Sequence, residues 1–173
     1  MAVQSIRLYP DDVLRRRCRS VASYDDDLRR LVADMIETMH SAPGVGLAAP
    51  QIGVELKVAV VDVTVGDVDD AMVVLINPEI VEDAGAESDV EGCLSIPEFT
   101  AKVVRPTWIR VHAQNLEGEP VEIEAENFVA RAICHEIDHL SGILFVDRLR
   151  GLRRDRGRRF LKRLRREAME LTA

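Results

Sequence analysis

The sequence predicts an α+β protein in which a mostly antiparallel strand region lies between helical segments. Apolar residues recur at three- and four-residue steps near both ends of the chain, which indicates amphipathic helices. The middle of the chain instead holds short β-branched runs separated by turn residues, which is typical of strands. The segment HEIDH, residues 135–139, follows the last of these runs and has the spacing of a helical site.

The composition is that of an ordinary globular protein. With 173 residues, 47% hydrophobic and 31% charged, the chain fits one catalytic domain, residues 1–173, and the disordered, collagen-like and disulfide-scaffold classes are excluded. The N-terminus lacks the apolar core of a signal peptide, and no window approaches 18 uncharged apolar residues. We therefore expect a cytoplasmic protein without a membrane partner. Its three cysteines are an odd, sparse set, which favours free, buried or metal-bound thiols over disulfides.

Helices are expected first. Residues 11–17 have the length of one short helix after Pro10, and a long helix follows Tyr24, with three aspartates suited to its N-terminus. His40, near its end, is interpreted as a favourable C-terminal charge and not as a metal ligand. The apolar stripe that predicts this helix consists of Leu28, Leu31, Val32, Met35, Ile36 and Met39.

The segment GVGLAAPQIG, residues 44–53, begins where Pro43 ends that helix. Its glycines and alanines supply little side-chain bulk, so it suits a place where backbone comes close to another group. It has neither the glycine spacing of a dinucleotide loop nor the Lys-Ser/Thr pair of a phosphate loop. Gln51 is its only polar side chain that both donates and accepts hydrogen bonds. Taken alone, the segment is equally compatible with a turn and with a binding site.

The strand region comes next. Residues 57–64 and 72–76 are β-branched runs separated by a turn at residues 66–70, and we expect them to pair. Asn77 and Pro78 are expected to break the second run, with residues 79–81 resuming it. Residues 103–104 and 107–113, interrupted by Pro106, are expected to pair with residues 121–125 across a turn at residues 116–118.

The HEIDH segment belongs to a helix expected to begin at Asn127 as its cap and to end at Ser141 and Gly142. Positions four apart share a helix face, so His135 and His139 can present two imidazoles to one metal ion. A lone H-x-x-x-H is equally compatible with a solvated helix. Glu136 directly after the first histidine favours a hydrolytic metal site with its own base.

The end of the chain is predicted to hold a strand at residues 144–146 and a basic helix at about residues 153–171. Eleven of the 23 Lys and Arg but only three of the 30 Asp and Glu lie between residues 148 and 173, so the tail is basic and the body acidic. We expect this helix to pack on the body with a solvated outer face. Its predicted apolar stripe is Phe160, Leu161, Leu164, Ala168 and Leu171.

A catalytic metal site needs a third protein ligand and an open position. Cys134 precedes His135 by about 100° around the helix, so its thiol should point elsewhere. Cys18 lies in a basic, helix-like segment. Cys93, in the segment EGCLSIPE, stands between Gly92 and a short apolar stretch and is the leading candidate, although the residues alone leave the choice open.

The three segments GVGLAAPQ, EGCLS and HEIDH, in this order and at these intervals, resemble the signature motifs of peptide deformylases. The resemblance extends from the first long helix to Val146. One position departs from it, because Cys134 stands where glutamine often precedes the first histidine. Since that side chain should not face the metal, the departure concerns local packing.

The resemblance implies a compact α+β fold with antiparallel β-sheets packed around the HExxH helix. It implies that Glu136 is the catalytic acid and base, and that Gln51 and the backbone N–H of Leu94 hold the carbonyl oxygen. Fe²⁺ would be the metal, with Zn²⁺, Ni²⁺ or Co²⁺ as substitutes. The implied metal ligands are Cys93, His135 and His139, and the residues lining the peptide would be Val45, Gly46 and Leu94. For a methionine pocket the candidates are Val45, Phe128 and Ala132, with Arg131 either bordering it or pointing away.

The implied reaction removes the formyl group from N-terminal formyl-methionine of nascent polypeptides and releases formate, with metal-bound water attacking the formyl carbon and Glu136 moving the proton. A zinc peptidase is the first alternative, since HExxH serves the same attack on an internal peptide bond. The second is a non-catalytic metal-binding or ribosome-associated module whose active part is the basic tail. That reading leaves Glu136 without a role.

Partners follow from the same resemblance and from the charge distribution. We expect N-formylmethionyl peptides as substrates, no DNA partner and a monomer. The outer face of the basic C-terminal helix is a candidate for contact with the ribosome, where such substrates emerge. Glu91 and Arg105 are a candidate ion pair that would brace the EGCLS turn, although either could be solvated instead.

Overall fold

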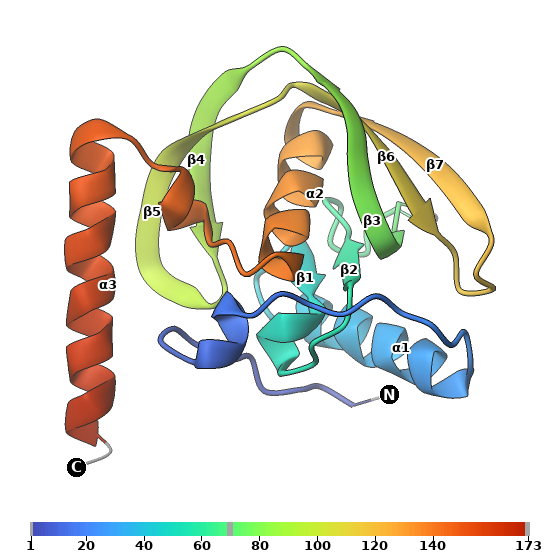
Figure 1. Cartoon of the computed structure of the whole chain (residues 1–173), viewed down its shortest axis with the longest axis horizontal. Coiled ribbons are helices and arrows are strands. Elements are labelled where there is room, and N and C mark those ends of the chain that lie inside the picture. Colours follow the sequence, from blue (N-terminus) through green and yellow to red (C-terminus); the bar gives the residue numbers. More distant parts are fainter. Residues whose placement is uncertain (1, 69–70, 172–173) are drawn as a thin grey trace.

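The computed structural model describes residues 2–68 and 71–171, so the predicted turn at residues 66–70 lies partly outside the described residues. Its architecture confirms the α+β class (Figure 1). A five-stranded sheet and a two-stranded sheet, both antiparallel, flank one helix, and a second helix ends the chain. The helices are α1 (Asp26–Ser41), α2 (Asn127–Leu140) and α3 (Gly151–Leu171), with 3₁₀ turns η1 (Asp12–Arg15), η2 (Ala49–Ile52) and η3 (Phe145–Arg148).

The larger sheet has the strand order β1-β2-β3-β6-β7, which places β1 at one edge. The predicted pairing of residues 57–64 with residues 72–76 is confirmed, with Val58 opposite Ile76. The hairpin across residues 116–118 is also confirmed. The strands are β1 (Gly46–Ala48), β2 (Val58–Val61), β3 (Val73–Ala84), β6 (Trp108–Gln114) and β7 (Pro120–Glu126).

The predicted break at Asn77 and Pro78 is wrong, because β3 runs through both residues with a bulge between Ile76 and Glu79. Asn77 has a left-handed backbone with φ +50°, which asparagine tolerates better than most residues. Its side-chain amide accepts a hydrogen bond from the N–H of Val21 at 2.8 Å and donates one to the carbonyl of Val21 at 3.0 Å. The bulge therefore fastens the N-terminal segment to the sheet.

The smaller sheet was not predicted. It is a hairpin of β4 (Glu87–Cys93) and β5 (Ile96–Arg105), and residues 103–104, expected to pair with residues 121–125, belong to it. Cys93 pairs with Ile96 and Glu91 pairs with Ala101, so residues 97–100 all stand opposite Gly92. Because Cys93 pairs with Ile96, only residues 94 and 95 separate them, and Cys93 lies at the turn of the hairpin.

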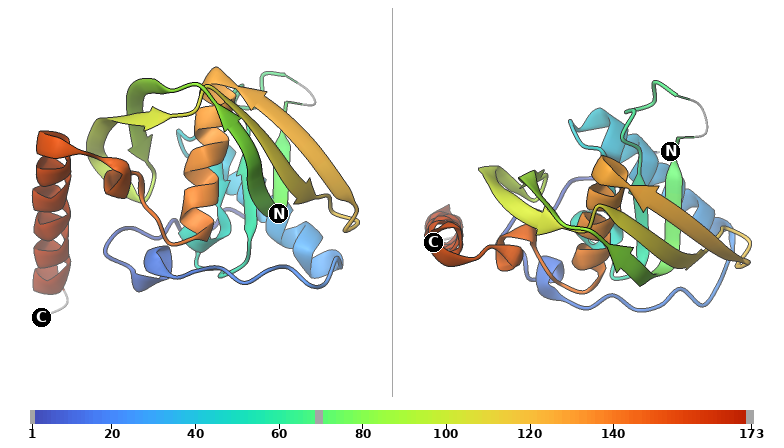
Figure 2. Two further views of the ribbon diagram at one scale, coloured as in Figure 1. Left: turned by 45° about the horizontal axis from the view of Figure 1, so that its top comes forward. Right: turned by 90° about the horizontal axis from the view of Figure 1, so that it is seen from above.

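The helix α2 lies between the two sheets (Figure 2). One face packs on the larger sheet through Ala130, Ile133, Cys134 and Leu140. Gly142 follows the helix with φ +73°, as expected of a C-terminal glycine. Asn127 is not the cap: it is the first helical residue, with φ +51°, its N–H donates to the carbonyl of Thr107, and the capping position belongs to Glu126.

The opposite side of β1 and β2 is covered by α1, whose predicted stripe is confirmed by the burial of Leu28, Val32, Met35 and Met39. Asp25 caps this helix by accepting hydrogen bonds from the N–H groups of Asp27 and Leu28. His40 lies away from the other histidines, with Nε2 2.9 Å from the buried Asp62 carboxylate.

The C-terminal part differs from the prediction in two places. Residues 144–146, predicted as a strand, belong largely to the 3₁₀ turn η3, and α3 begins at Gly151, two residues earlier than expected. The stripe of α3 is buried at Leu161 and half-buried at Phe160 and Leu164, whereas Leu171 is 89% exposed. None of the helices within residues 2–68 and 71–171 combines the length and apolarity that a membrane span requires.

Candidate metal centre and adjoining cleft

Three potential metal ligands converge where the hairpin β4/β5 meets α2. Cys93 comes from the end of β4, whereas His135 and His139 lie one turn apart on α2. Their ligand atoms all lie within 4.8 Å of one another, and the Sγ atom of Cys93 is 3.3 Å from Nε2 of His139. Among the described residues this is the one group of three or more such side chains with that spacing.

The donor set fits a transition-metal ion. One thiolate and two imidazoles are ligands that Zn²⁺ and Fe²⁺ both accept, and three protein ligands leave a coordination position open. The Nδ1 atom of His135 is 3.1 Å from a carboxylate oxygen of Glu91, which leaves Nε2 for the centre. A carboxylate behind a ligating histidine is the usual arrangement for fixing the ring at a metal site.

A buried ionic network holds this arrangement. Arg105 donates two hydrogen bonds to Glu91, at 2.8 and 3.0 Å, and a third to Asp138 at 2.7 Å, which confirms the predicted pairing of Glu91 with Arg105. Arg131 also donates to Glu91 at 2.8 Å. Burial alone would raise the pKa of Glu91, but the bonds from His135 and Arg105 outweigh it and lower the pKa to about 2. Glu91 is therefore a carboxylate at neutral pH.

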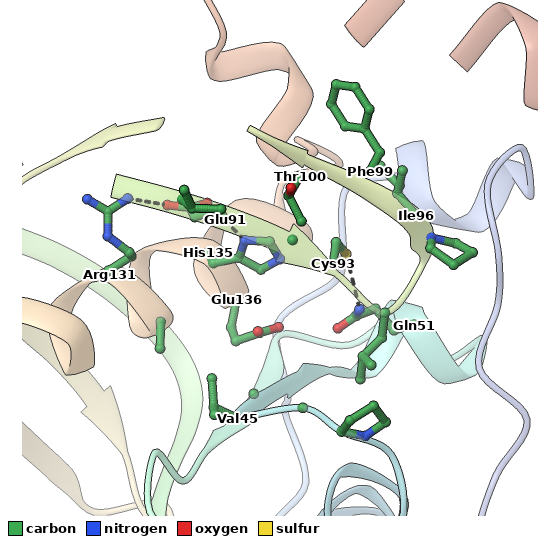
Figure 3. Close-up of a pocket in the computed structure, with 18 of the residues that line it drawn as sticks. Val45, Gln51, Glu91, Cys93, Ile96, Phe99, Thr100, Arg131, His135 and Glu136 are labelled. Carbon is green, nitrogen blue, oxygen red and sulfur yellow. Dashed lines mark hydrogen bonds and ion pairs between the residues drawn. The ribbon is translucent and has the colours of Figure 1, made fainter. Parts of the chain in front are cut away.

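Glu136 differs from Glu91 because its carboxyl group is buried with one oxygen that has no hydrogen-bond partner among the described residues. Burial raises the pKa of Glu136 to about 7. Figure 3 shows the carboxyl group of Glu136 between His135 and Val45. A Cβ atom on Gly46 would lie 2.4 Å from Glu136 Oε1, so any larger residue would have to displace this carboxyl group. The expected close approach of the GVGLAAPQIG backbone is thus to Glu136.

The cleft has a volume of about 540 Å³ and is where the three motifs meet. Leu94 lines it, and its N–H makes no hydrogen bond to any residue that the structure describes. Arg131, whose position the sequence left open, borders the cleft with its guanidinium held by Glu91. The predicted site residues that line the cleft are Val45, Gly46, Gln51, Cys93, Leu94, Phe128, Ala132, His135 and Glu136, whereas His139 is buried behind them.

Gln51 is held at both ends of its side-chain amide. The oxygen accepts a hydrogen bond from the N–H of Ala48 at 2.8 Å, and Nε2 donates to Ser95 Oγ at 3.2 Å, with Cys93 Sγ 3.7 Å away. The N-terminal segment adds backbone bonds from Arg7 to Gln51 and from Tyr9 to Ser95. Gln51 Nε2 is therefore fixed beside the candidate ligand Cys93.

Sequence reasoning missed several residues of the site. Ser95 lies inside the EGCLS motif and Asp138 inside HEIDH. Their place in these motifs was the only feature of the sequence that could have identified them as site residues. The part of the cleft formed by residues 97–100 depends on the hairpin, which was itself not predicted. Cys18 and Cys134 are buried in the core around α2, where burial raises the pKa of each thiol to about 11, as expected for cysteines that do not ligate a metal.

Comparison with known proteins gives a consistent result. The polypeptide deformylase family matches residues 3–155. The chain is 54% identical over 149 residues to peptide deformylase 1 of Clostridium acetobutylicum, covering 86% of this chain and 96% of that protein. It is 44% identical over 166 residues to the peptide deformylase of Acidobacterium capsulatum, covering 96% and 98%. The crystal structure of a peptide deformylase from Legionella pneumophila matches with a TM-score of 0.86 at 42% identity, covering 97% and 98% of the two chains.

Metal binding should depend on Cys93 and not on Cys134. Removing a group that only orients a ligand typically costs about 10- to 100-fold in affinity, so Cys93→Ala should cost at least about 100-fold, whereas Cys134→Ala should leave the affinity unchanged. Zn²⁺ titration of the metal-free variants, with unfolding temperature as a control for folding, measures both. Equal affinity of Cys93→Ala and Cys134→Ala would exclude Cys93 as a ligand.

Metal binding should also release a proton at neutral pH. Burial alone would lower the pKa of His135. Its hydrogen bonds to Cys93 and Glu91 outweigh this effect, so in the metal-free protein the pKa of His135 is raised to about 10. A ligating nitrogen must lose that proton, so affinity should rise as the pH increases from 6 to 8. Calorimetry in buffers of different ionisation enthalpy counts the protons released. A release of no protons would contradict this assignment of His135.

Proposed function

The chain belongs to the polypeptide deformylase family, hydrolases that remove the formyl group from N-terminal methionine, and we propose that its cleft performs this reaction on nascent polypeptides with a bound metal ion. The convergence of Cys93, His135, His139 and Glu136 in one cleft supports the proposal most strongly. The same cleft is lined by all three motifs of the sequence. An amide hydrolase needs a proton acceptor, oxyanion donors and a place for the peptide, and the chain offers residues for each.

Cys93, His135 and His139 would hold the metal, which we propose is Fe²⁺, with Zn²⁺, Ni²⁺ or Co²⁺ as substitutes. A divalent ion in such a site acts as a Lewis acid and lowers the pKa of water from about 15.7 toward about 7. The thiolate reduces the net charge of the site and gives it soft character, which suits ferrous iron and also accepts zinc. Glu91 and Arg105 keep His135 in place for this role.

Glu136 would move the proton in both halves of the reaction. It accepts a proton from the attacking water as the water oxygen bonds to the formyl carbon. It then delivers that proton to the peptide nitrogen as the C–N bond breaks, so the products are formate and a free amine. A pKa raised to about 7 by burial matches this double role, because efficient acid–base groups titrate near the working pH.

Gln51 and Leu94 would stabilise the negative charge that develops on the formyl oxygen. The Nε2 group of Gln51 is held beside Cys93, and the N–H of Leu94 has no acceptor within the described residues. Donors fixed before the reaction stabilise an oxyanion without reorganisation, which is why such groups contribute strongly.

The peptide would bind along the edge of β1. This strand is the last of its sheet, and Val45 and Gly46 face the cleft opposite β4, so an extended substrate can lie between two sheet edges. The methionine side chain would enter the apolar part of the cleft beside Val45, Phe128 and Ala132. The hydrogen bond from Arg131 to Glu91 would keep the guanidinium group out of this apolar part of the cleft.

We further propose that residues 1–173 act as one catalytic domain and a monomer in the cytoplasm. The basic outer face of α3 would contact ribosomal RNA, because the substrate appears at the ribosome. Arg154, Arg158 and Lys162 are exposed at four-residue spacing and form one stripe on this helix. No DNA or membrane partner is proposed.

Replacing Glu136 should abolish most of the activity without removing the metal. Glu136→Ala should lower formate release from a formyl-Met-Ala peptide by about 100- to 10,000-fold, the usual contribution of a positioned acid–base group. Metal content and unfolding temperature serve as controls, and an unformylated peptide distinguishes a deformylase from a peptidase. Unchanged formate release, or cleavage of the unformylated peptide, would sink the proposal.

Replacing Gln51 should slow turnover through the loss of one oxyanion donor. Gln51→Ala should lower kcat by about 100- to 1,000-fold, or about 2.7–4 kcal/mol in the barrier. Gln51→Glu retains an acceptor for the Ala48 N–H but removes the donor, so it should be as slow as Gln51→Ala. Metal content should stay at the wild-type level in both. Near-wild-type activity of Gln51→Glu would assign Gln51 a structural role only.

Ribosome contact should depend on the exposed stripe of α3. The triple variant Arg154→Gln, Arg158→Gln and Lys162→Gln should co-sediment more weakly with ribosomes and show a shallower salt dependence, because each lost phosphate contact reduces the salt slope by about 1. Its activity on formyl-Met-Ala should equal that of the wild type. Ribosome binding that is insensitive both to salt and to this variant would rule the contact out.

A further inference from the structure

A second groove, which we call the hairpin groove, adjoins the catalytic cleft and is lined by residues of the hairpin β4/β5 and of α3. Figure 1 shows that α3 lies beside this hairpin. Its volume is about 240 Å³, and it shares Val90, Phe99 and Thr100 with the cleft. Figure 3 shows Thr100 and Phe99 on the side of the cleft away from Glu136 and Val45. Its remaining lining residues are Ala101, Lys102, Arg153 and Arg156.

Packing of α3 on the hairpin fixes the far wall of this groove. The rings of Phe99 and Phe160 lie 4.7 Å apart. Gly157 faces the same region, because a Cβ atom there would make an ordinary contact with Phe99 at 3.7 Å and a tight one with Leu149 at 3.1 Å. Arg156 stacks over the Phe99 ring, with its guanidinium carbon 5.6 Å from the ring centre. Arg153 and Arg156, the two cations of α3 that line the groove, therefore belong to a helix that is packed against the hairpin.

The charge of the hairpin groove is unbalanced. Lys102, Arg153 and Arg156 line it together with apolar and hydroxyl side chains, and no carboxylate is among its lining residues in the described part of the chain. None of the three forms an ion pair with a described residue. By contrast, Arg163 and Arg166 on the same helix are close to Glu167 and Glu170. The groove thus offers three cations and a partly apolar floor to a ligand that brings negative charge.

The distance from the metal ligands suits a peptide that leaves the cleft. Val90 is three residues from Cys93 along β4, which corresponds to about 10 Å at about 3.3 Å per residue. In an extended substrate whose formyl carbon lies beside Cys93, the third residue is at about the same distance. For a substrate that runs along β4 from Cys93 toward Val90, the third and fourth residues reach the groove. An RNA strand, by contrast, would have no reason to share lining residues with the catalytic cleft.

From these observations we propose that the hairpin groove binds the third and fourth residues of the formylated peptide and favours acidic side chains there. This inference rests on the proposed function, because it assigns the cleft to formyl-methionine. Lys102 of β5 and Arg153 and Arg156 of α3 supply the charge, and Phe99 supplies the apolar contact. The hairpin groove is then a specificity site for the sequence that follows the second residue.

The test compares formyl-Met-Ala peptides that continue with Asp-Asp or with Lys-Lys. Exposed ion pairs contribute modestly, so kcat/KM should favour Asp-Asp by about 3- to 10-fold in dilute buffer. The preference should vanish near 1 M salt, where the screening length is about 3 Å. The groove variant Lys102→Gln, Arg153→Gln and Arg156→Gln should lose the preference and keep wild-type activity on formyl-Met-Ala alone.

The matched control is the variant Arg154→Gln, Arg158→Gln and Lys162→Gln, which removes the same charge from α3 away from the groove and should keep the preference. A wild-type enzyme that releases formate equally from both peptides overturns the inference but leaves the proposed function intact. Absence of formate from formyl-Met-Ala overturns the proposed function itself. A groove variant that loses ribosome binding while keeping peptide preference assigns the groove to RNA and likewise overturns the inference.

Discussion

The site depends on one buried arginine. Arg105 of β5 bridges Glu91 of β4 and Asp138 of α2, and all three side chains are at least nine-tenths buried. Two carboxylates in the interior would be unfavourable without it, since removing one partner of a buried ion pair typically costs about 3–5 kcal/mol. The geometric consequence matters more than the energy. Arg105 fastens the hairpin that carries Cys93 to the helix that carries both histidines.

A second constraint acts on the opposite wall of the cleft. Gly46 of β1 approaches Glu136 so closely that a methyl group would displace the carboxyl group. The same close approach keeps the Glu136 carboxyl buried, and burial is what raises its pKa toward neutrality. Glu91 and Glu136, both buried and on opposite sides of His135, thus have pKa values of about 2 and about 7. Their hydrogen bonds account for this difference, because His135, Arg105 and Arg131 bond to Glu91, whereas one oxygen of Glu136 has no partner among the described residues.

Sequence periodicity predicted the helices whose buried residues form a regular stripe. It failed for segments whose conformation is determined by contacts with distant parts of the chain. The stripe of α1 and the four-residue spacing on α2 follow from helix geometry alone. The hairpin β4/β5 was missed because β4 is polar and mostly exposed, so it lacks the alternation that marks a half-buried strand. Asn127 failed as a cap because its backbone bonds to Thr107 of a neighbouring segment. Residues 144–146 are a short apolar run, a pattern that does not distinguish a strand from a short buried helical segment such as η3.

The uneven charge of the chain affects peptide binding differently at long and at short range, because α3 brings two of its arginines to the hairpin groove. Residues 1–147 carry most of the carboxylates, so at long range the body repels acidic peptides and attracts basic ones. That repulsion is screened beyond about 8 Å at physiological salt, whereas contacts with Lys102, Arg153 and Arg156 act at a few ångströms. The protein can therefore disfavour acidic peptides during long-range approach and favour them once they are bound in the groove. Because Phe99 contacts both Phe160 and Arg156, the packing that holds α3 also places the charge that would make this reversal.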